Sequence, residues 1–451
     1  MLAPWATPGH KDYVAPEPRR TVLRGSDLPE RFGPPETVQT ITIGPWSTTY
    51  GRRNFGDCKL GRKDRAARLA QLADRIAAHP GGTLPDKFSD PADLQAFYRM
   101  MNRKEVTHAL VFQPHGELTL VKMRAAGCPV LIIHDTTELD YTGLTSLADE
   151  LGQIGNGGGR GWLCHNSLAV NADTGEVLGL VGQILYRRPD RPKGETHTQR
   201  RRRADRESSL WTRGSEAVGP APDGSLWVDV CDRGADVFEY MAGREKAGRR
   251  FLVRAAQDRN IRVLQEGETR NAKLFAHVRG LPAPGRRTVE APAGPGRKGR
   301  KAEVTVAAGP LTVTPTKGTT GGTPQALWAV CVREPKPPAG GTAVEWILLS
   351  NVPTAGLAAA ERLVSWYERR WIIEELHQAM KTGCGVETMQ FTTAAAMQPA
   401  IAVLSVTAVC GCGCGTHRVG RRRATGPRRS RWIRKWCGCR PRGAAGTPAG
   451  R

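Results

Sequence analysis

Hydrophobic residues recur at helical spacing in the first quarter of the chain. One face of a first segment carries Leu69, Leu72 and Ile76. The following segment, SDPADLQAFYRMMN, has a capping residue at Asp90, a proline in its first turn and apolar residues three and four apart. We therefore predict a small helical domain over residues 41–115. Residues 1–40 are rich in proline and charge without a clear period, which predicts a poorly ordered leader.

From residue 116 the pattern changes to strands that alternate with helices. The apolar run PVLIIHD ends in Asp135, and the run LWVDVCD ends in Asp232. Between them, SLAVNADTGEVLGLVGQILY is typical of two strands joined at DTGE, and RRFLVRA is a further strand. This order predicts an α/β layer over residues 116–255, in which the carboxylates collect at one edge of the sheet.

Residues 256–345 do not continue this alternation. They are rich in proline and glycine and contain two strand patterns, KAEVTVAA and GPLTVTP, which predicts a β-rich insertion. The α/β pattern returns over residues 346–409 with the strand AVEWILLSNVP and a helix from about Thr354 to Lys381.

Four residues of that helix share one face at about 100° per residue, Tyr367, Arg370, Glu374 and Lys381. One acid thus lies among two cations and a phenol. A solvated face with ordinary i,i+4 pairs gives the same pattern, so the spacing alone leaves both interpretations open.

The charge of the chain favours a polyanionic partner. The formal net charge is +23, of which residues 410–451 contribute +12 and the first 409 residues +11. Nucleic acid is the simplest such partner. In the helical domain we expect Arg62, Lys63 and Arg65 to contact DNA phosphates, and a merely solvated basic surface is the alternative.

Composition also bears on location. The chain opens without the apolar core of a secretory signal and has no apolar run long enough to cross a bilayer, so we expect a cytoplasmic protein without a membrane partner. Six single cysteines are scattered through the predicted elements, and we expect them to be reduced and mostly buried: Cys58, Cys128, Cys164, Cys231, Cys331 and Cys384.

Three carboxylates are candidates for metal-assisted chemistry, namely Asp135, Asp232 and Glu374. Oxygen ligands suit Mg²⁺ or Mn²⁺, and two such ions about 3.5 to 4 Å apart hold the attacking and leaving oxygens of an in-line phosphoryl transfer. A single aspartate at a strand end is ordinarily a cap or turn residue. The three together, on two strands and a helix, predict a catalytic site.

At these residues the sequence resembles the bacterial DDE transposases of the insertion sequence four group. The resemblance is carried by HDTT around Asp135, VCDRGADVFEY around Asp232 and the signature Tyr-x2-Arg-x3-Glu-x6-Lys. Similar flanking stretches include ADELGQIGNGGGRGWLCH, EWILLSNVP and RWIIEELHQAMKTGCG. It covers roughly residues 50–409.

This resemblance implies a ribonuclease H-like catalytic core, split by the β-rich insertion and preceded by the helical DNA-binding domain. It implies that the acidic triad binds two divalent ions, Mg²⁺ or Mn²⁺. It also implies a set of contacts to transposon-end DNA: Tyr367, Arg370, Lys381, Arg254 and Trp346. Trp346 matches a tryptophan on which a flipped base stacks, although an ordinary core tryptophan has the same sequence signature.

The activity implied is cut-and-paste transposition. Water cuts one strand, the new 3′-OH attacks the other strand to form a hairpin, and the end is reopened and joined to target DNA. The partners are transposon terminal repeats, target DNA and a second protomer in a synaptic complex, in a nucleoid-associated protein. The alternatives are a truncated protein that binds ends without cutting and a stand-alone ribonuclease H-like nuclease.

The tail, residues 410–451, departs from the family, which continues with helices that pair two protomers. It has no acidic residue and contains five of the eleven cysteines. Zinc binding by these cysteines and His417 is one explanation, but Cys-x-Cys-x-Cys is not a usual zinc spacing. Out-of-frame translation of a GC-rich gene explains the composition better, and a basic disordered tail is the third explanation. A chain without the pairing region would bind ends but fail to assemble a cutting complex.

Overall fold

The structure is a computed structural model. It describes residues 49–189, 194–196, 199, 203, 205–291, 299–315, 322–339 and 341–413, with side chains up to residue 410 in the last range. The predicted leader, residues 1–40, and nearly all of the predicted tail lie outside the described residues.

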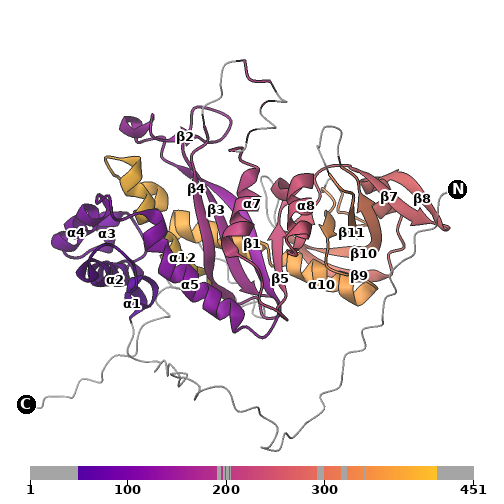
Figure 1. Cartoon of the computed structure of the whole chain (residues 1–451), viewed down its shortest axis with the longest axis horizontal. Helices are drawn as coiled ribbons and strands as arrows, with labels where there is room; N and C mark the ends of the chain where they lie inside the picture. Colours follow the sequence, from indigo (N-terminus) through magenta and orange to yellow (C-terminus); the bar gives the residue numbers. More distant parts are fainter. Residues whose placement is uncertain are drawn as a thin grey trace, which may run out of the picture. The chain divides into compact units, whose positions relative to one another are not determined.

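The described chain begins with a helical region, as predicted (Figure 1). Its helices are α1 (Tyr50–Phe55), α2 (Lys63–Ala78), α3 (Leu84–Lys87), α4 (Pro91–Met101) and α5 (His108–Arg124). The side chain of Asp90 accepts a hydrogen bond from the backbone nitrogen of Ala92, which confirms the predicted cap of α4. Helix α5 continues through residue 115, so the backbone passes from the helical region into the following layer without a linker.

A buried lysine fixes this region beside the segment that follows the signature helix. Lys87 donates to the carbonyl oxygens of Pro80, Gly81 and Gly82, and burial lowers its pKa to about 8. The loop that it holds lies against Gly385, which has a φ of 63°. Apolar side chains of α2 and α4 belong to the same hydrophobic cluster as those of the sheet and of α12 (Ala394–Gly413). The helical region therefore shares its core with the rest of the described chain.

The strands form one large mixed sheet (Figure 1). They are β1 (Val130–Asp140), β2 (Gly152–Gln153), β3 (Arg160–Asn171), β4 (Val177–Tyr186), β5 (Trp227–Cys231), β6 (Arg250–Arg254), β7 (Asn260–Gln265), β8 (Glu268–Lys273), β9 (Gly285–Ala291), β10 (Arg300–Val313), β11 (Gln325–Arg333) and β12 (Glu345–Ser350). The order is β2-β3-β1-β5-β6-β12-β11-β10-β7-β8, with β4 on β3 and β9 on β10. Strands β1, β5 and β6 are parallel, and the other pairs are antiparallel.

The remaining described elements are helices and short turns. They are η1 (Thr145–Leu147), α7 (Ser209–Val218), η2 (Arg233–Ala235), α8 (Phe238–Lys246), α9 (Leu274–Arg279), α10 (Leu357–Glu368), α11 (Trp371–Gln378), η3 (Ala379–Gly383), η4 (Val386–Thr388) and α12. Helix α7 packs where His134 and His165 emerge from the sheet, whereas α11 packs against Asn166 and therefore covers the opposite face of β3. No helix in the described part of the chain is both long and apolar enough to cross a membrane.

Three predicted boundaries are wrong. Strand β1 does not end at Asp135 but continues to Asp140, because β3 pairs with its whole length. The two strands predicted at KAEVTVAA and GPLTVTP are one strand, β10. Pro310 is tolerated there because it lies between the segments of β10 that pair with β9 and with β7, so on that edge its missing N–H costs no ladder bond.

The third correction concerns the predicted helix from Thr354 to Lys381, which is three segments, α10, α11 and the π-helical turn η3. Hydrogen bonds from Arg370 to Tyr367 and from Ile372 to Arg369 tighten the chain between the first two segments. The Arg369 side chain holds this break by donating to the carbonyl oxygens of Ser365 and Asp173.

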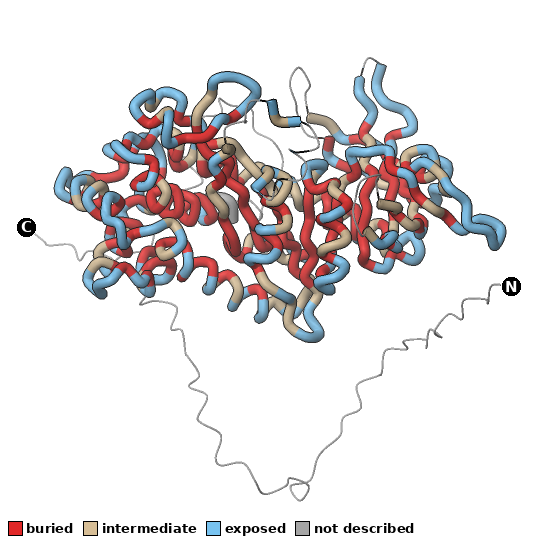
Figure 2. Tube along the Cα trace, turned by 45° about the horizontal axis from the view of Figure 1, so that its top comes forward, coloured by how far each residue is buried: buried red, intermediate tan, exposed pale blue. Residues whose placement is uncertain are grey.

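The predicted β-rich insertion consists mainly of β7 to β11, and it extends the same hydrogen-bonded sheet through the pairing of β11 with β12. Buried residues run through the central strands, and exposed ones gather at the loops and hairpin ends (Figure 2). Of the six single cysteines, all are free thiols and only Cys128 is not fully buried, which confirms that prediction.

Replacing Gly385 with alanine tests the docking of the helical region. Its new Cβ would overlap the carbonyl oxygen of Gly82, and a positive φ strains any residue with a side chain. We expect the free energy of unfolding to fall by about 1–3 kcal/mol. The matched control is Gly383→Ala, whose Cβ meets only ordinary contacts. Calorimetric melting of both variants checks this, and equal melting temperatures would contradict it.

Candidate active site

Two aspartates lie side by side because of the register of two parallel strands. Strand β1 pairs with β5 from Val130 opposite Trp227 to His134 opposite Cys231, where the ladder ends. The next residue on each strand is an aspartate, Asp135 on one and Asp232 on the other. Asp232 leaves the sheet at this point and caps η2, since its Oδ1 accepts a hydrogen bond of 2.7 Å from the backbone nitrogen of Gly234.

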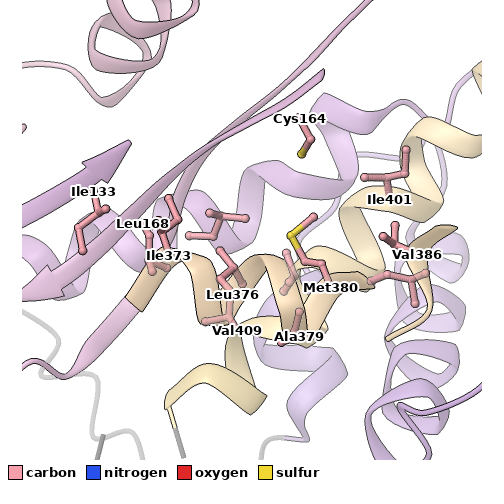
Figure 3. Packing of buried hydrophobic residues seen from close by; sticks show 14 of the residues in the cluster. Ile133, Cys164, Leu168, Ile373, Leu376, Ala379, Met380, Val386, Ile401 and Val409 are labelled. Atoms are coloured by element: carbon pink, nitrogen blue, oxygen red, sulfur yellow. The ribbon is translucent and has the colours of Figure 1, made fainter. Parts of the chain in front are cut away.

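Helix α11 brings the third carboxylate to Asp135. Its residues Ile373 and Leu376 are fully buried in the cluster that also contains Ile133 of β1 (Figure 3). Ile133 and Asp135 lie on the same face of the strand, two residues apart. The apolar contact therefore places Glu374 of α11 next to Asp135.

A histidine that the sequence analysis did not single out, His377, lies next to Asp135 and Glu374. Ligand atoms of Asp135, Glu374 and His377 all lie within 4.8 Å of one another, and this is a group of metal-ligand type in the described residues. Opposite ligands of one Mg²⁺ or Mn²⁺ ion are about 4–5 Å apart, since each lies roughly 2.0–2.6 Å from the ion. The two carboxylates therefore suit a divalent cation, and His377 lies beside them. The spacing Glu-x2-His on one helix was the available signal for His377.

An arginine neutralises part of this charge. Nη1 of Arg370 lies 3.0 Å from Oδ2 of Asp135 and 3.2 Å from Oε1 of Glu374. The Arg370 and Asp135 side chains are only 14% and 13% exposed, whereas Glu374 is 37% exposed. In this arrangement Arg370 bridges two of the three predicted catalytic acids, so its cation and a metal ion would compete for the same oxygens.

The pKa of Asp135 reflects the remaining imbalance. Burial and the neighbouring carboxylate of Asp232 raise this pKa to about 7, although the Arg370 guanidinium opposes the shift. Burial, with Lys381 and Arg370 nearby, lowers the pKa of His377 to about 3, so its ring is uncharged at neutral pH. Without a cation, the site thus holds a proton on or near Asp135 at the lower end of the physiological range.

Aromatic and basic side chains flank the acids. The rings of Trp346 and Tyr367 lie with centroids 5.5 Å apart, and Trp346 is partly buried against the core. Arg254 donates a hydrogen bond of 2.8 Å to the carbonyl oxygen of Glu345. Burial raises the pKa of Tyr367, and the guanidinium groups of Arg254 and Arg370 act against this shift. The structure thus brings four of the predicted residues together around Tyr367: Trp346, Tyr367 itself, Arg254 and Arg370.

Lys381 lies near His377 but pairs with a different acid. Its ammonium group is 3.1 Å from the carboxylate of Glu387, which also accepts a hydrogen bond from the backbone nitrogen of Asp140. The π-helical turn η3 carries Lys381 toward that end of β1, five residues beyond Asp135. The single predicted helix face is therefore divided between two places.

The predicted basic residues of the helical region differ in their surroundings. Lys63 is exposed, and Arg62 forms an exposed ion pair of 2.9 Å with Asp64. Arg65 instead donates to the carbonyl oxygen of Leu60 and is 19% exposed, so it braces the turn before α2.

The comparison with protein families bears on this same region. Residues 47–106 match the family model described as transposase DNA-binding. The match indicates a transposase role. It also supports DNA as a partner, in agreement with the basic composition, and it covers helices α1 to α4.

The raised pKa of Asp135 gives a stability prediction for the metal-free protein. An unfolded aspartate titrates near pH 4, whereas the folded one keeps its proton to about pH 7. The unfolding free energy of the wild type should therefore fall as the pH rises between these values. The variant Asp135→Asn has no carboxyl group to ionise at this position, so its unfolding free energy should not show this fall. For the wild type, the fall amounts to about 1.4 kcal/mol for each unit by which the pKa of Asp135 is raised.

Denaturant unfolding in EDTA at pH 4.5, 6 and 8 measures the difference in unfolding free energy between Asp135→Asn and the wild type. This difference should grow with pH and level off above pH 7. The control is Asp140→Asn on the same strand, because hydrogen bonds from Thr142 lower the pKa of Asp140 and place its effect below pH 4. A difference between wild type and Asp135→Asn that does not change with pH would contradict the shift.

Proposed function

We propose that this chain is a cut-and-paste DNA transposase of the DDE type, of the insertion sequence four group and most similar to the transposase of transposon five. The observation that carries the proposal is the register of β1 and β5, which sets Asp135 beside Asp232, with Glu374 of α11 against Asp135. The same chain contains the match to a transposase DNA-binding domain. We assign the layer around β1, β3, β4, β5 and β6 to a ribonuclease H-like core.

The three acids would hold the cations of the reaction. We propose Asp135, Asp232 and Glu374 as ligands of two Mg²⁺ or Mn²⁺ ions. When bound, such ions polarise the phosphate and lower the pKa of the attacking water. Asp135 serves this role only when ionised, and its pKa of about 7 means that cation binding must release a proton near neutral pH.

The neighbouring side chains would orient the DNA. Arg370 is the cation nearest to both acids, so release of its carboxylates would free its guanidinium for a phosphate oxygen. Arg254 and Tyr367 present a second cation and a phenol at the Asp232 side of the site. Trp346 is only partly buried, which leaves part of its ring for stacking on an extruded base. Lys381 would contact DNA only if its pair with Glu387 opened.

The helical region would bind the terminal repeat, with Lys63 and Arg62 as phosphate contacts. A synaptic homodimer on two transposon ends and a target DNA completes the proposal. The tail argues for one alternative, a chain that binds ends without cutting. The stand-alone nuclease is disfavoured, since a DNA-binding region is present.

Cleavage of supercoiled DNA that carries the element's ends tests the main proposal. With Mg²⁺ or Mn²⁺, the wild-type chain should cut at the ends, and Asp135→Ala and Glu374→Ala should cut at least about a hundredfold more slowly. Both variants should still retard end DNA on a gel. Glu138→Gln is the control, because this acid of β1 instead accepts a hydrogen bond from the Gly155 nitrogen.

Normal metal-dependent cutting by Asp135→Ala would overturn the assignment of the acids. Retardation without cutting by the wild type would favour the binding-only alternative. Equal cutting of DNA without the ends would favour a nuclease.

The phosphate contacts give a second prediction. Replacing Arg62 and Lys63 together with alanine should weaken end binding and reduce the slope of log affinity against log salt by about 0.9 for each phosphate that the variant no longer neutralises. Fluorescence anisotropy at several salt concentrations measures the slope. Arg270→Ala on β8 removes another exposed cation, outside the matched region, and should leave the slope unchanged. Equal slopes for the double variant and the wild type would exclude binding of phosphate by these two residues.

A further inference from the structure

Hydrogen bonds link four side chains in a row along one face of the sheet, from α5 to α11. Nε2 of His108 lies 2.9 Å from Oε1 of Gln183, and Nε2 of Gln183 donates a hydrogen bond of 2.7 Å to Oδ1 of Asn166. Nδ2 of Asn166 then lies 3.2 Å from Nε2 of His377. The four residues belong to α5, β4, β3 and α11, so hydrogen bonds join four separate elements.

The register of the sheet makes the centre of this chain rigid. Asn166 of β3 is directly opposite Gln183 of β4, so both amides emerge on the same face. Asn166 is 0% exposed, Gln183 is 9% exposed and His377 is 7% exposed. Buried amides cost free energy unless they are bonded, and apolar residues of the same volume would fill the space without that cost. What the amides add is a defined orientation for the groups at their ends.

This row of hydrogen bonds also has a donor-to-acceptor direction. Oδ1 of Asn166 accepts from Gln183 and, at 3.6 Å, from the thiol of Cys164. These two donors assign the amide orientation, so Nδ2 is the atom that faces His377. Nε2 of His377 is therefore an acceptor, and the proton of the uncharged ring is on Nδ1.

The two ends of this row of hydrogen bonds, His377 and His108, lie at the two functional regions. His377 has a ring nitrogen within 4.8 Å of carboxylate oxygens of Asp135 and Glu374. His108 is the first residue of α5 and lies two residues beyond the region that matches the transposase DNA-binding family, which ends at residue 106. A shift of α5 against β4 would thus change the hydrogen bond that starts the chain.

We propose that His377 is a positioning residue of the candidate cation site and that Asn166, Gln183 and His108 hold its ring in place. The seating of the first turn of α5 on β4 then influences how tightly the site binds a divalent cation. This inference rests on the proposed function for the existence of the cation site. It adds Asn166, which lies directly opposite Asp135 in the register of β1 and β3, and two residues that reach His377 through Asn166, Gln183 and His108.

The affinity of the DNA-free full chain for Mn²⁺, measured from the electron paramagnetic resonance of the free ion, tests the proposal. Loss of a group that orients a metal site commonly weakens binding about 10- to 100-fold. We expect about tenfold weaker binding for Asn166→Leu and His377→Ala, and a several-fold loss for the shape-conserving variant Gln183→Met. The double variant Asn166→Leu with His377→Ala should bind no more weakly than His377→Ala alone, since both act through one ring.

Ser167→Ala is the matched control. Ser167 is the neighbour of Asn166 on β3, is equally buried and bonds His134 on the opposite face of the sheet. Its loss also removes a buried hydrogen bond, so unchanged Mn²⁺ affinity in this variant separates positioning from general loosening of the sheet. Melting temperatures identify any variant that fails to fold, and Gln183→Met then stands as the mildest test.

A spectroscopic measurement reads the ring itself. Nitrogen-15 spectra of histidine-labelled protein, with His377→Gln to assign the signal, should show the Nδ1–H form of His377 in the wild type. A mixture of both forms is expected in Asn166→Leu. An unchanged ring signal in that variant would overturn the proposal.

The Mn²⁺ data also separate this inference from the proposed function. Wild-type affinity in Asn166→Leu and Gln183→Met, together with loss of binding in Asp135→Ala and Glu374→Ala, would overturn the positioning role alone. Wild-type affinity in Asp135→Ala and Glu374→Ala as well would show that the acids are not the cation site, and the proposed function would fail with it.

Discussion

The parallel ladder between β1 and β5 ends at His134 and Cys231, and the geometry of the site depends on that end point. Because the strands are parallel and in register, the next residues, Asp135 and Asp232, are forced beside each other. Burial of Asp135, together with the like charge of Asp232 beside it, raises the pKa of Asp135. Arg370 offsets part of this shift from the break between α10 and α11. A divalent cation would offset more of it, which is the physical reason that such a cluster suits metal chemistry.

The break between α10 and α11 decides where the cations of this segment lie. A straight helix would align Arg370 and Lys381 on one face, as its spacing suggests. The tight turn at Arg369 and Arg370 and the π-helical turn η3 instead separate them: Arg370 bridges Asp135 and Glu374, and Lys381 pairs with Glu387 near Asp140. The two cations thus pair with acids at two different points along β1.

The helical region and the candidate site share one hydrophobic core. Apolar residues of α2, α4, α11 and α12 belong to one cluster, and Lys87 holds the loop after α2 close to Gly385. Helix α5 connects these two regions without a flexible linker. Its first residue, His108, begins the row of buried hydrogen bonds that leads to His377. Closely packed elements transmit displacement because their interiors have little free volume.

The sequence by itself determined the features that local patterns control. The spacing of Leu69, Leu72 and Ile76 predicted α2, Asp90 and Pro91 predicted the start of α4, and the apolar run before Asp232 predicted the end of β5. The helical region was predicted from its apolar spacing, and the family match supports its role in DNA binding. The three acids were predicted from strand ends and motifs, and their catalytic role stays a prediction. Each of these depends on residues that are neighbours along the chain, where propensity and period act directly.

Only the tertiary structure decided the features that depend on distant pairing. Strand β1 continues past Asp135 because β3 pairs with it, and β10 continues past Pro310 because its partners change there. Likewise, His377 joins the acids only after α11 docks on β1, and Asn166 meets Gln183 only through the register of β3 and β4. Hydrogen bonds and packing between segments far apart in sequence fixed these points, and no local period carries that information.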